Sequence, residues 1–407
     1  MLPSCMSRPQ FRSRQGDCRS RHHPDHPPSY DLVMSSTPRQ RILDALSHRQ
    51  PTETPFSWGL GLTAAMQDDM RQHCAGLGLD WDLLREAVDD RRLLFSHWTQ
   101  PLPAERDGVI INEWGIHMRQ VSYGKGSYRE FVDFPLAAAT TAADLDLHAW
   151  PDPSHWDANA LRETIISGDP QRQRAVVLAA GNPFEIYSWL TGLEQAMVNL
   201  AENPELVTDA LTRITSICDA RVRANFKAAG DLIDMVFYAD DLGGQEKLLI
   251  SRPTYRRMIQ PHHRRLCATV REVAPHAKIL FHSDGAVFDI LPDLVDSGID
   301  CLEAVQTDAG GMVPERLKER WAGKLAFHGA ISVQQILPRG TPETVAEECR
   351  HLERVLGAGG GWIAAPTHAV QVGTPPANVL AMVETILGAE RWAAAIETSR
   401  LLTAVAC

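Results

Sequence analysis

The ionisable residues that could do chemistry in this sequence stand at the ends of short apolar runs. His282 and Asp284 follow Ile279-Leu280-Phe281, and His368 follows shortly after Ile363-Ala364-Ala365. Side chains two residues apart on a strand point to the same side, so His282 and Asp284 are expected to face one way. Two histidines and a carboxylate suit an open site for zinc or another divalent ion. We therefore predict a metal site made of His282, Asp284 and His368.

Three more apolar runs end in polar side chains: Asp240 and Asp241 after 236–238, Glu303 and Gln306 after 301–302, and His328 after 325–327. Barrel enzymes place their chemistry at the carboxyl ends of parallel strands. One of the two aspartates could instead cap a loop. We interpret the following as site residues: Asp240, Asp241, Glu303 and His368 as catalytic groups, and Gln306 and His328 as substrate contacts.

Some of these residues have a structural alternative. Asp284 could cap the helix expected after it, and His282 or His328 could hydrogen-bond to a neighbour inside the core. By contrast, His262 and His263 stand beside two arginines on a predicted helix. We interpret those two histidines as part of a solvated helix face.

The elements that must position these residues alternate short apolar runs with longer helical patterns, which is typical of parallel βαβ architecture. Eight parallel strands are the number that closes a barrel. We therefore predict an α/β fold, a (β/α)8 TIM barrel. The eight candidate strands are Thr54–Leu60, Arg92–Trp98, Ala175–Gly181, Leu232–Asp240, Ala277–Ser283, Ile299–Gln306, Lys324–Ala330 and Gly361–Thr367.

A long insertion follows the second predicted strand. Within it, Val109–Trp114 and Ile116–Tyr123 alternate in polarity around Gly115, which predicts a β-hairpin. We expect this hairpin to lie as a flap over the barrel mouth. Helix starts are predicted at Asn203-Pro204 and Thr341-Pro342, because each pairs a capping side chain with proline at the first helical position.

Bulk properties bound the class of protein. The 407 residues are 44% apolar and carry a formal net charge of −11, which excludes a general nucleic-acid binder. Eight cysteines without a CxxC pair favour reduced thiols in a cytoplasmic protein. The sequence has no run of 18 or more apolar residues, so we expect no transmembrane helix. Residues 1–36 are rich in arginine, histidine and proline, so we predict a disordered extension, or a start at Met34, before one barrel domain over 37–407.

At these strand ends the sequence resembles the uroporphyrinogen decarboxylase superfamily, which includes the methylcobalamin:coenzyme M methyltransferases. The resemblance covers roughly residues 37–390 and implies the same barrel, with its site at the strand carboxyl ends. It also implies substrate contacts at Trp58, Asn182 and Trp189. The stretches that carry it are Gly181-Asn182-Pro183-Phe184-Glu185, Asp240-Asp241-Leu242-Gly243, Phe281-His282-Ser283-Asp284-Gly285, Ala365-Pro366-Thr367-His368 and Thr374-Pro375-Pro376-Ala377-Asn378.

Departures from the family patterns bear on the activity. Decarboxylases of this superfamily carry an arginine-rich signature after the first strand, whereas residues 57–62 here contain no arginine, and Trp189 replaces a family tyrosine. His368 matches a decarboxylase active-site histidine. The methyltransferase branch binds zinc through a His-x-Cys pair and a distant cysteine; this chain has His282-Ser283-Asp284 and His368 at those places.

Three hypotheses follow. The first is metal-assisted methyl transfer or demethylation of a small substrate with a corrinoid protein as partner, in which Glu303 is a fourth ligand or a proton carrier. The second is cofactor-free decarboxylation of a pyrrole-type substrate in porphyrin biosynthesis, in which Asp240 or Asp241 orients ring N–H groups and His368 assists proton transfer. The third is a barrel that binds a small ligand without turnover. The resemblance also leaves a homodimer open.

Overall fold

The computed structural model describes residues 36–401. The predicted extension over residues 1–36 therefore lies outside the described residues except for Ser36, and so does the end of the predicted barrel domain, 402–407. The strands are β1 (Arg91–Leu94), β2 (His97–Trp98), β3 (Val109–Ile111), β4 (His117–Tyr123), β5 (Gly126–Phe131), β6 (Trp156–Asp157), β7 (Ala175–Gly181), β8 (Met235–Ala239), β9 (Lys278–His282), β10 (Cys301–Ala304), β11 (Ala326–Ile331) and β12 (Trp362–Pro366).

Fifteen α-helices accompany these strands within the described residues, and the last of them breaks at Gly388. They are α1 (Pro38–Leu46), α2 (Ala64–Gly76), α3 (Trp81–Val88), α4 (Ala142–Asp146), α5 (Ala158–Gly168), α6 (Pro183–Thr191), α7 (Leu193–Glu202), α8 (Pro204–Ala229), α9 (Arg252–Met258), α10 (Gln260–Val273), α11 (Leu291–Asp296), α12 (Pro314–Trp321), α13 (Ile336–Arg339), α14 (Pro342–Leu352) and α15 (Pro376–Leu401).

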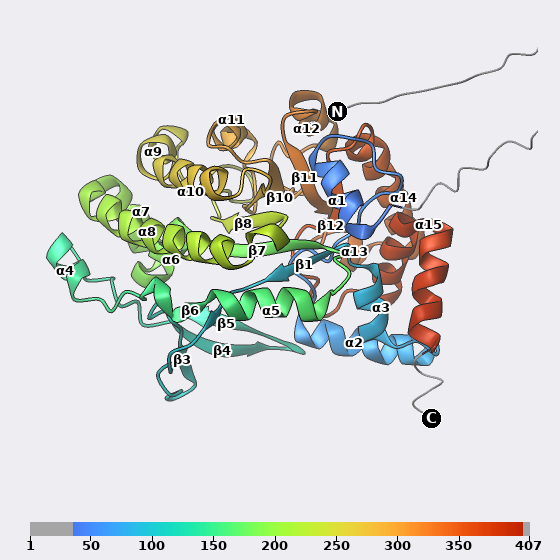
Figure 1. Ribbon diagram of the computed structural model, residues 1–407, viewed down its shortest axis with the longest axis horizontal. Helices are drawn as coiled ribbons and strands as arrows, with labels where there is room; N and C mark the ends of the chain where they lie inside the picture. The colour runs from blue at the N-terminus through green and yellow to red at the C-terminus, as the bar shows by residue number, and fades with distance from the viewer. Residues whose placement is uncertain (1–35, 402–407) are drawn as a thin grey trace, which may run out of the picture. The chain divides into compact units, whose positions relative to one another are not determined.

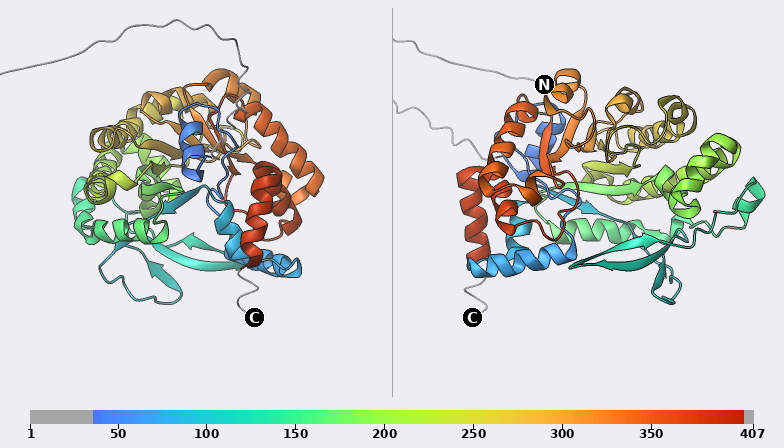
Figure 2. Two further views of the ribbon diagram at one scale, coloured as in Figure 1. Left: turned by 45° about the vertical axis from the view of Figure 1, so that its right-hand side comes forward. Right: turned by 180° about the vertical axis from the view of Figure 1, so that it is seen from behind.

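Seven of the strands form one parallel sheet in the order β1-β7-β8-β9-β10-β11-β12. Most residues of its strands are apolar, and β7 to β12 are almost entirely buried, as expected when helices cover a parallel sheet. The register places Glu303 of β10 beside His282 of β9 and His328 of β11. Helices surround the strands (Figures 1 and 2).

The two edges of this sheet meet the same short segment, Pro55–Ser57. On one side the Ser57 amide donates to the Ala364 carbonyl of β12 at 2.9 Å, and on the other the Asp90 amide donates to the Phe56 carbonyl at 2.9 Å. The segment thereby completes the ring that β1 and β12 leave open. The α/β prediction is confirmed, with seven of the eight predicted strands present as parallel strands and the first reduced to a single bridge.

Asp90 holds the segment Pro55–Ser57 next to β1, and we expect substitution of Asp90 to destabilise the fold. Its buried carboxylate accepts hydrogen bonds from Arg41 (2.6 Å), the Phe56 amide (3.1 Å) and Arg391 (3.1 Å). We expect Asp90→Ala to lower the free energy of unfolding by about 3 kcal/mol, because Arg41 and Arg391 lose the buried carboxylate that pairs with both and keep only the more exposed Glu53. Urea denaturation checks this.

The matched control is Asp68→Ala, which removes an aspartate that pairs with Arg71 on the surface of α2. Exposed pairs of this kind contribute about 1 kcal/mol at most. Equal destabilisation by the two substitutions would contradict the role given to Asp90.

The insertion between β1 and β7 holds a three-stranded antiparallel sheet, β3-β4-β5. It has one strand more than the predicted hairpin. Strand β5 packs near α2 (Figure 1). The Tyr123 hydroxyl at the end of β4 donates to Gln371 Oε1 at 3.0 Å, so this sheet touches the loop after β12 that carries His368.

The predicted helix starts are present: the Asn203 side chain caps α8, and Thr341 forms a capping box on α14. Among residues 36–401, none of the helices has the length and apolar character needed to cross a membrane.

Candidate functional site

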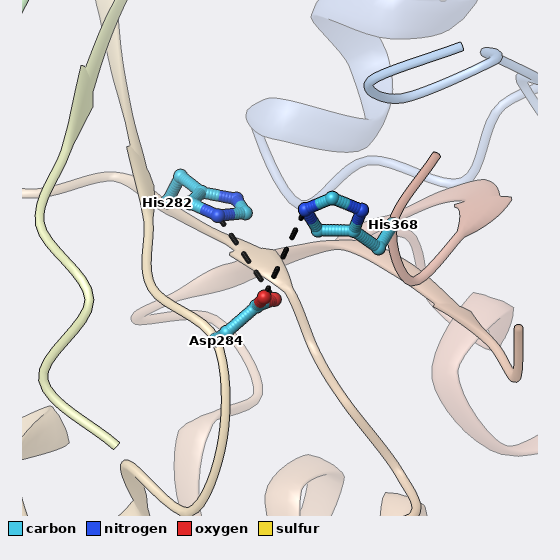
Figure 3. Close-up of side chains that lie close together, drawn as sticks. All are labelled: His282, Asp284 and His368. Atoms are coloured by element: carbon cyan, nitrogen blue, oxygen red, sulfur yellow. Dashed lines mark ion pairs between the residues drawn. The ribbon is translucent and has the colours of Figure 1, made fainter. Parts of the chain in front are cut away.

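Three side chains converge at the carboxyl end of the sheet. His282 ends β9, Asp284 lies two residues beyond it, and His368 lies in the loop after β12 (Figure 3). His282 Nε2 and His368 Nε2 each lie 3.9 Å from an Asp284 carboxylate oxygen, and one ligand atom of each residue falls within 4.8 Å of the other two. The sequence prediction thus placed three residues from two distant segments in one cluster.

The cluster offers three ligand atoms to a divalent cation. Bonds of about 2.1 Å in a tetrahedral site hold ligand atoms about 3.4 Å apart. The two histidine nitrogens lie 3.9 Å from the Asp284 oxygens, so the side chains would move inward by about half an ångström to hold an ion. His282 is buried, whereas the His368 side chain is 42% exposed and that of Asp284 is 31% exposed, so the cluster is open on one side. An open side is what a catalytic site needs for substrate. The donor set of two nitrogens and an oxygen suits zinc and other divalent ions.

Glu303 orients the buried histidine from below. His282 Nδ1 donates to Glu303 Oε2 at 3.0 Å, which leaves Nε2 facing Asp284 and Asp241 Oδ1, the latter at 3.6 Å. A carboxylate behind a histidine in this way fixes the ring and its tautomer for metal binding. Glu303 was predicted as a catalytic group. In the structure it is fully buried, and His282 lies between it and the open side of the cluster.

The same contacts shift the pKa values of both groups. Burial alone would lower the pKa of His282, but the charges of Glu303, Asp284 and Asp241 outweigh it and raise the pKa to about 10. Burial would raise the pKa of Glu303, yet the charge and hydrogen bond of His282 hold it well below its ordinary value. Without a metal ion, His282 and Glu303 therefore form a buried ion pair.

His328 lies deeper in the barrel. Its Nδ1 is 3.7 Å from Glu303 Oε1, and its Nε2 is 3.0 Å from the Ser57 hydroxyl, which also accepts from Arg91 Nε at 2.6 Å. Burial and the charge of Arg91 lower the pKa of His328 to about 4, so this ring is neutral. The predicted substrate contact is not supported, because His328 is fully buried beneath Glu303.

Asp240 and Asp241 point in different directions. Asp240 is fully buried; it accepts from the Glu185 amide at 2.8 Å and from His263 Nε2 at 2.6 Å, so it holds the loop rather than facing a substrate. Asp241 faces the cluster. The interpretation of His262 and His263 as a solvated face is wrong, because both are buried against neighbouring elements.

A cavity of about 400 Å³ borders the cluster at Asp241. Trp189, one of the predicted substrate contacts, lines this cavity and stacks on Phe131 of β5 at 5.1 Å between ring centroids. Thus the insertion sheet contributes one wall of the cavity. The full lining is Glu130, Phe131, Phe134, Phe184, Glu185, Ser188, Trp189, Leu193, Asp241, Gly243 and Leu249.

The remaining predicted substrate contacts lie behind this cavity or away from it. Asn182 Nδ2 donates to Glu185 Oε2 at 2.7 Å, and Gln306 Oε1 accepts from the Gly285 amide at 2.9 Å, so both position neighbours of the site. Trp58 packs on Trp81 of α3 and donates to the Arg85 carbonyl. Its predicted role in substrate binding is not supported by this position, which serves the contact between the sheet and the helix layer.

Glu185 is the site residue that sequence reasoning missed. It stands in the first turn of α6, where a carboxylate is ordinary near a helix start, and only the cavity gives it another meaning. Burial and the charges of Asp241 and Asp240 raise its pKa to about 8. One sequence signal could have identified it: Glu185 follows closely after Asn182, the polar residue at the end of the apolar strand β7.

Glu185→Gln is expected to stabilise the protein in alkaline but not in acidic solution. The folded-state pKa lies above that of the unfolded chain, so ionisation destabilises the fold as pH rises from the unfolded pKa through about 8. Thermal unfolding should therefore show the variant melting several degrees above wild type at about pH 9 and no higher at about pH 5. The same offset at both pH values would contradict the assignment, and Glu315→Gln on the exposed face of α12 is the control.

Comparison with known proteins places this chain in a family. The family model described as uroporphyrinogen decarboxylase (URO-D) matches residues 140–388. A uroporphyrinogen decarboxylase of Coxiella burnetii is 23% identical over 261 residues, 62% of this chain and 68% of that protein. A methylated-thiol–coenzyme M methyltransferase of Methanosarcina mazei is 28% identical over 204 residues, 49% of this chain and 50% of that protein.

Among solved structures, a methyltransferase from Methanosarcina mazei matches with a TM-score of 0.60 at 18% identity, covering 86% of this chain and 98% of that one. The likeness shows a shared fold. Because the family match alone spans more than half of the sequence, this chain belongs to the uroporphyrinogen decarboxylase (URO-D) family.

Proposed function

We propose that this protein is a metal-dependent methyltransferase or demethylase that acts on a small substrate at the mouth of a (β/α)8 barrel. The observation that carries the proposal is the convergence of His282, Asp284 and His368 within 4.8 Å. A divalent ion held by these three residues would act as a Lewis acid on the substrate heteroatom that gains or loses the methyl group. As the sequence resemblance implies, the methyl carrier would be a corrinoid protein.

The chain's own residues supply the rest of the chemistry. Glu303 holds the Nδ1 proton of His282 and so keeps Nε2 directed at the open side. Asp241 lies between the cluster and the cavity and can accept a proton or a hydrogen bond from a substrate there. Trp189 and Phe131, stacked on each other, give the same cavity an apolar surface for the substrate.

The second candidate is decarboxylation in porphyrin biosynthesis, which the identity to the Coxiella burnetii decarboxylase favours. The electrostatics of the cavity argue against a substrate rich in carboxylates. Its acidic lining residues are Glu130, Glu185 and Asp241, and none of the side chains lining it is basic. Like charges at close range would repel such a substrate. Homodimer formation and a cytoplasmic location stay predictions.

The test is an activity comparison on zinc-loaded, cobalt-loaded and metal-free protein. Methylated small molecules are supplied with reduced corrinoid, and methylcobalamin formation is followed by absorbance; uroporphyrinogen is supplied in parallel. We expect metal-dependent methyl transfer and no coproporphyrinogen. Coproporphyrinogen formation with no methyl transfer from any donor would overturn the proposal in favour of the decarboxylase.

A further inference from the structure

The cavity beside the cluster has an unusual combination of walls. Four of its lining residues are aromatic and three are acidic, and its lining includes no lysine, arginine or histidine. The aromatic residues are Phe131, Phe134, Phe184 and Trp189, and the acidic residues are Glu130, Glu185 and Asp241. Its size, about 400 Å³, is that of a site for a small organic molecule.

None of the residues that line the cavity gives its acidic side chains a basic partner. Glu185 accepts a hydrogen bond from the neutral amide of Asn182. Asp241 accepts from the Asp284 backbone amide and lies 3.6 Å from His282 Nε2, which is outside the lining. Glu130 contributes least, because Arg119 stands opposite it across the β4–β5 pair. Burial, and after it the negative charges of Asp241 and Asp240, raise the pKa of Glu185, so part of this shift comes from the surplus of acidic groups.

Each simple class of ligand uses these walls differently. A neutral aromatic ligand would cover the rings but remove water from the exposed part of the Asp241 carboxylate without offering it a charge, which is costly. An anion would be repelled. A bare inorganic cation would gain nothing from four aromatic rings, whereas an organic cation attracts both the ring faces and the carboxylates.

We propose that this cavity binds a small organic cation with a methylated ammonium group, whose methyl groups lie against Trp189 and Phe131 and whose charge faces Glu185 and Asp241. Binding itself needs no metal ion. Its service as the methyl-bearing substrate rests on the proposed function, because Asp241 is the residue that joins the cavity to the cluster, 3.6 Å from His282 Nε2.

The test compares choline with 3,3-dimethyl-1-butanol, its uncharged isostere in which carbon replaces the ammonium nitrogen. Both are titrated calorimetrically into metal-free and zinc-loaded protein at about pH 9, above the pKa of about 8 of Glu185, so that this carboxylate is ionised. We expect choline to bind at least about tenfold more tightly than the isostere. Glu185→Gln and Asp241→Asn, which preserve shape, should reduce this preference to about threefold or less, while Glu315→Gln should leave it unchanged.

Three results would overturn the inference. The isostere could bind as tightly as choline or more tightly, or neither compound could bind at millimolar concentration. The preference for choline could also persist in both amide variants. The outcome is independent of the proposed function. Choline binding by a protein that holds no metal would leave the cavity assignment standing and remove the metal-dependent enzyme. Methyl transfer from neutral donors without choline binding would support the metal-dependent enzyme and rule out the proposed cation site in the cavity.

Discussion

Replacement of His282 by alanine is expected to remove the bound divalent ion and to lower the rate of methyl transfer on the order of 1000-fold. The estimate follows because a metal ion acting as a Lewis acid stabilises charge in the transition state by several kcal/mol, and each 1.4 kcal/mol or so is a factor of ten in rate. His282 is the one buried member of the cluster and the one held by a carboxylate behind it. Steady-state kinetics with zinc-loaded protein measure the effect.

Two variants keep this prediction interpretable. His351→Ala removes an exposed histidine that pairs with Glu315, and it should change neither rate nor metal content. Asp284→Asn removes a charged ligand without emptying buried space, so it should lose activity while its circular dichroism stays that of wild type. Full activity in Asp284→Asn and His282→Ala would exclude a catalytic role for the cluster.

Glu303→Gln is expected to cost about 3 kcal/mol of folding free energy at neutral pH and to weaken metal binding roughly 10- to 100-fold. The carboxylate is fully buried between His282 and His328, and its pKa is well below its ordinary value. The amide removes the counter-charge nearest to protonated His282 and leaves Asp241 and Asp284 at 3.6 and 3.9 Å. It also weakens the hydrogen bond that fixes the direction of the ring, because a neutral amide oxygen is a poorer acceptor than a carboxylate.

The pH dependence separates this account from simple loss of packing. A folded-state pKa below that of the unfolded chain stabilises the fold above the unfolded pKa, about 4.3, and this contribution is lost as pH falls toward the folded-state pKa. The difference in unfolding free energy between wild type and Glu303→Gln should thus be largest between the unfolded-state pKa values of Glu303 and His282, about 4.3 and about 6.5. It should shrink in acid as Glu303 is protonated, and shrink in alkali as His282, whose folded-state pKa is about 10, loses its proton. Urea denaturation across this range measures it, with Glu315→Gln as the exposed counterpart. A difference that does not vary with pH would indicate packing alone.

The strand ends could be predicted from the sequence because each apolar run that enters a parallel sheet stops at a polar residue. That rule located His282, Asp284 and His368, although 84 residues separate Asp284 from His368. Likewise, it located the seven parallel strands. The segment Pro55–Ser57 is shorter than the predicted strand because it holds its place through Asp90 and Ala364, and such contacts leave no local pattern.

What the sequence could not show depends on which face of an element meets its neighbours. His263 sits beside arginines in the chain, yet its side of α10 packs inward and its ring reaches Asp240. Glu185 resembles an ordinary residue of a first helical turn until Asp241 and Trp189 are brought beside it. Periodicity finds an element, whereas burial of a polar side chain follows from the tertiary packing around it.

The most direct test of the central claim is the metal content of purified protein after incubation with zinc and removal of excess ion. The account predicts about one zinc per chain in wild type and in His351→Ala, and a small fraction of that in His282→Ala, Asp284→Asn and His368→Ala. Wild-type protein without bound zinc, cobalt or manganese would contradict the claim. So would full occupancy in all three cluster variants.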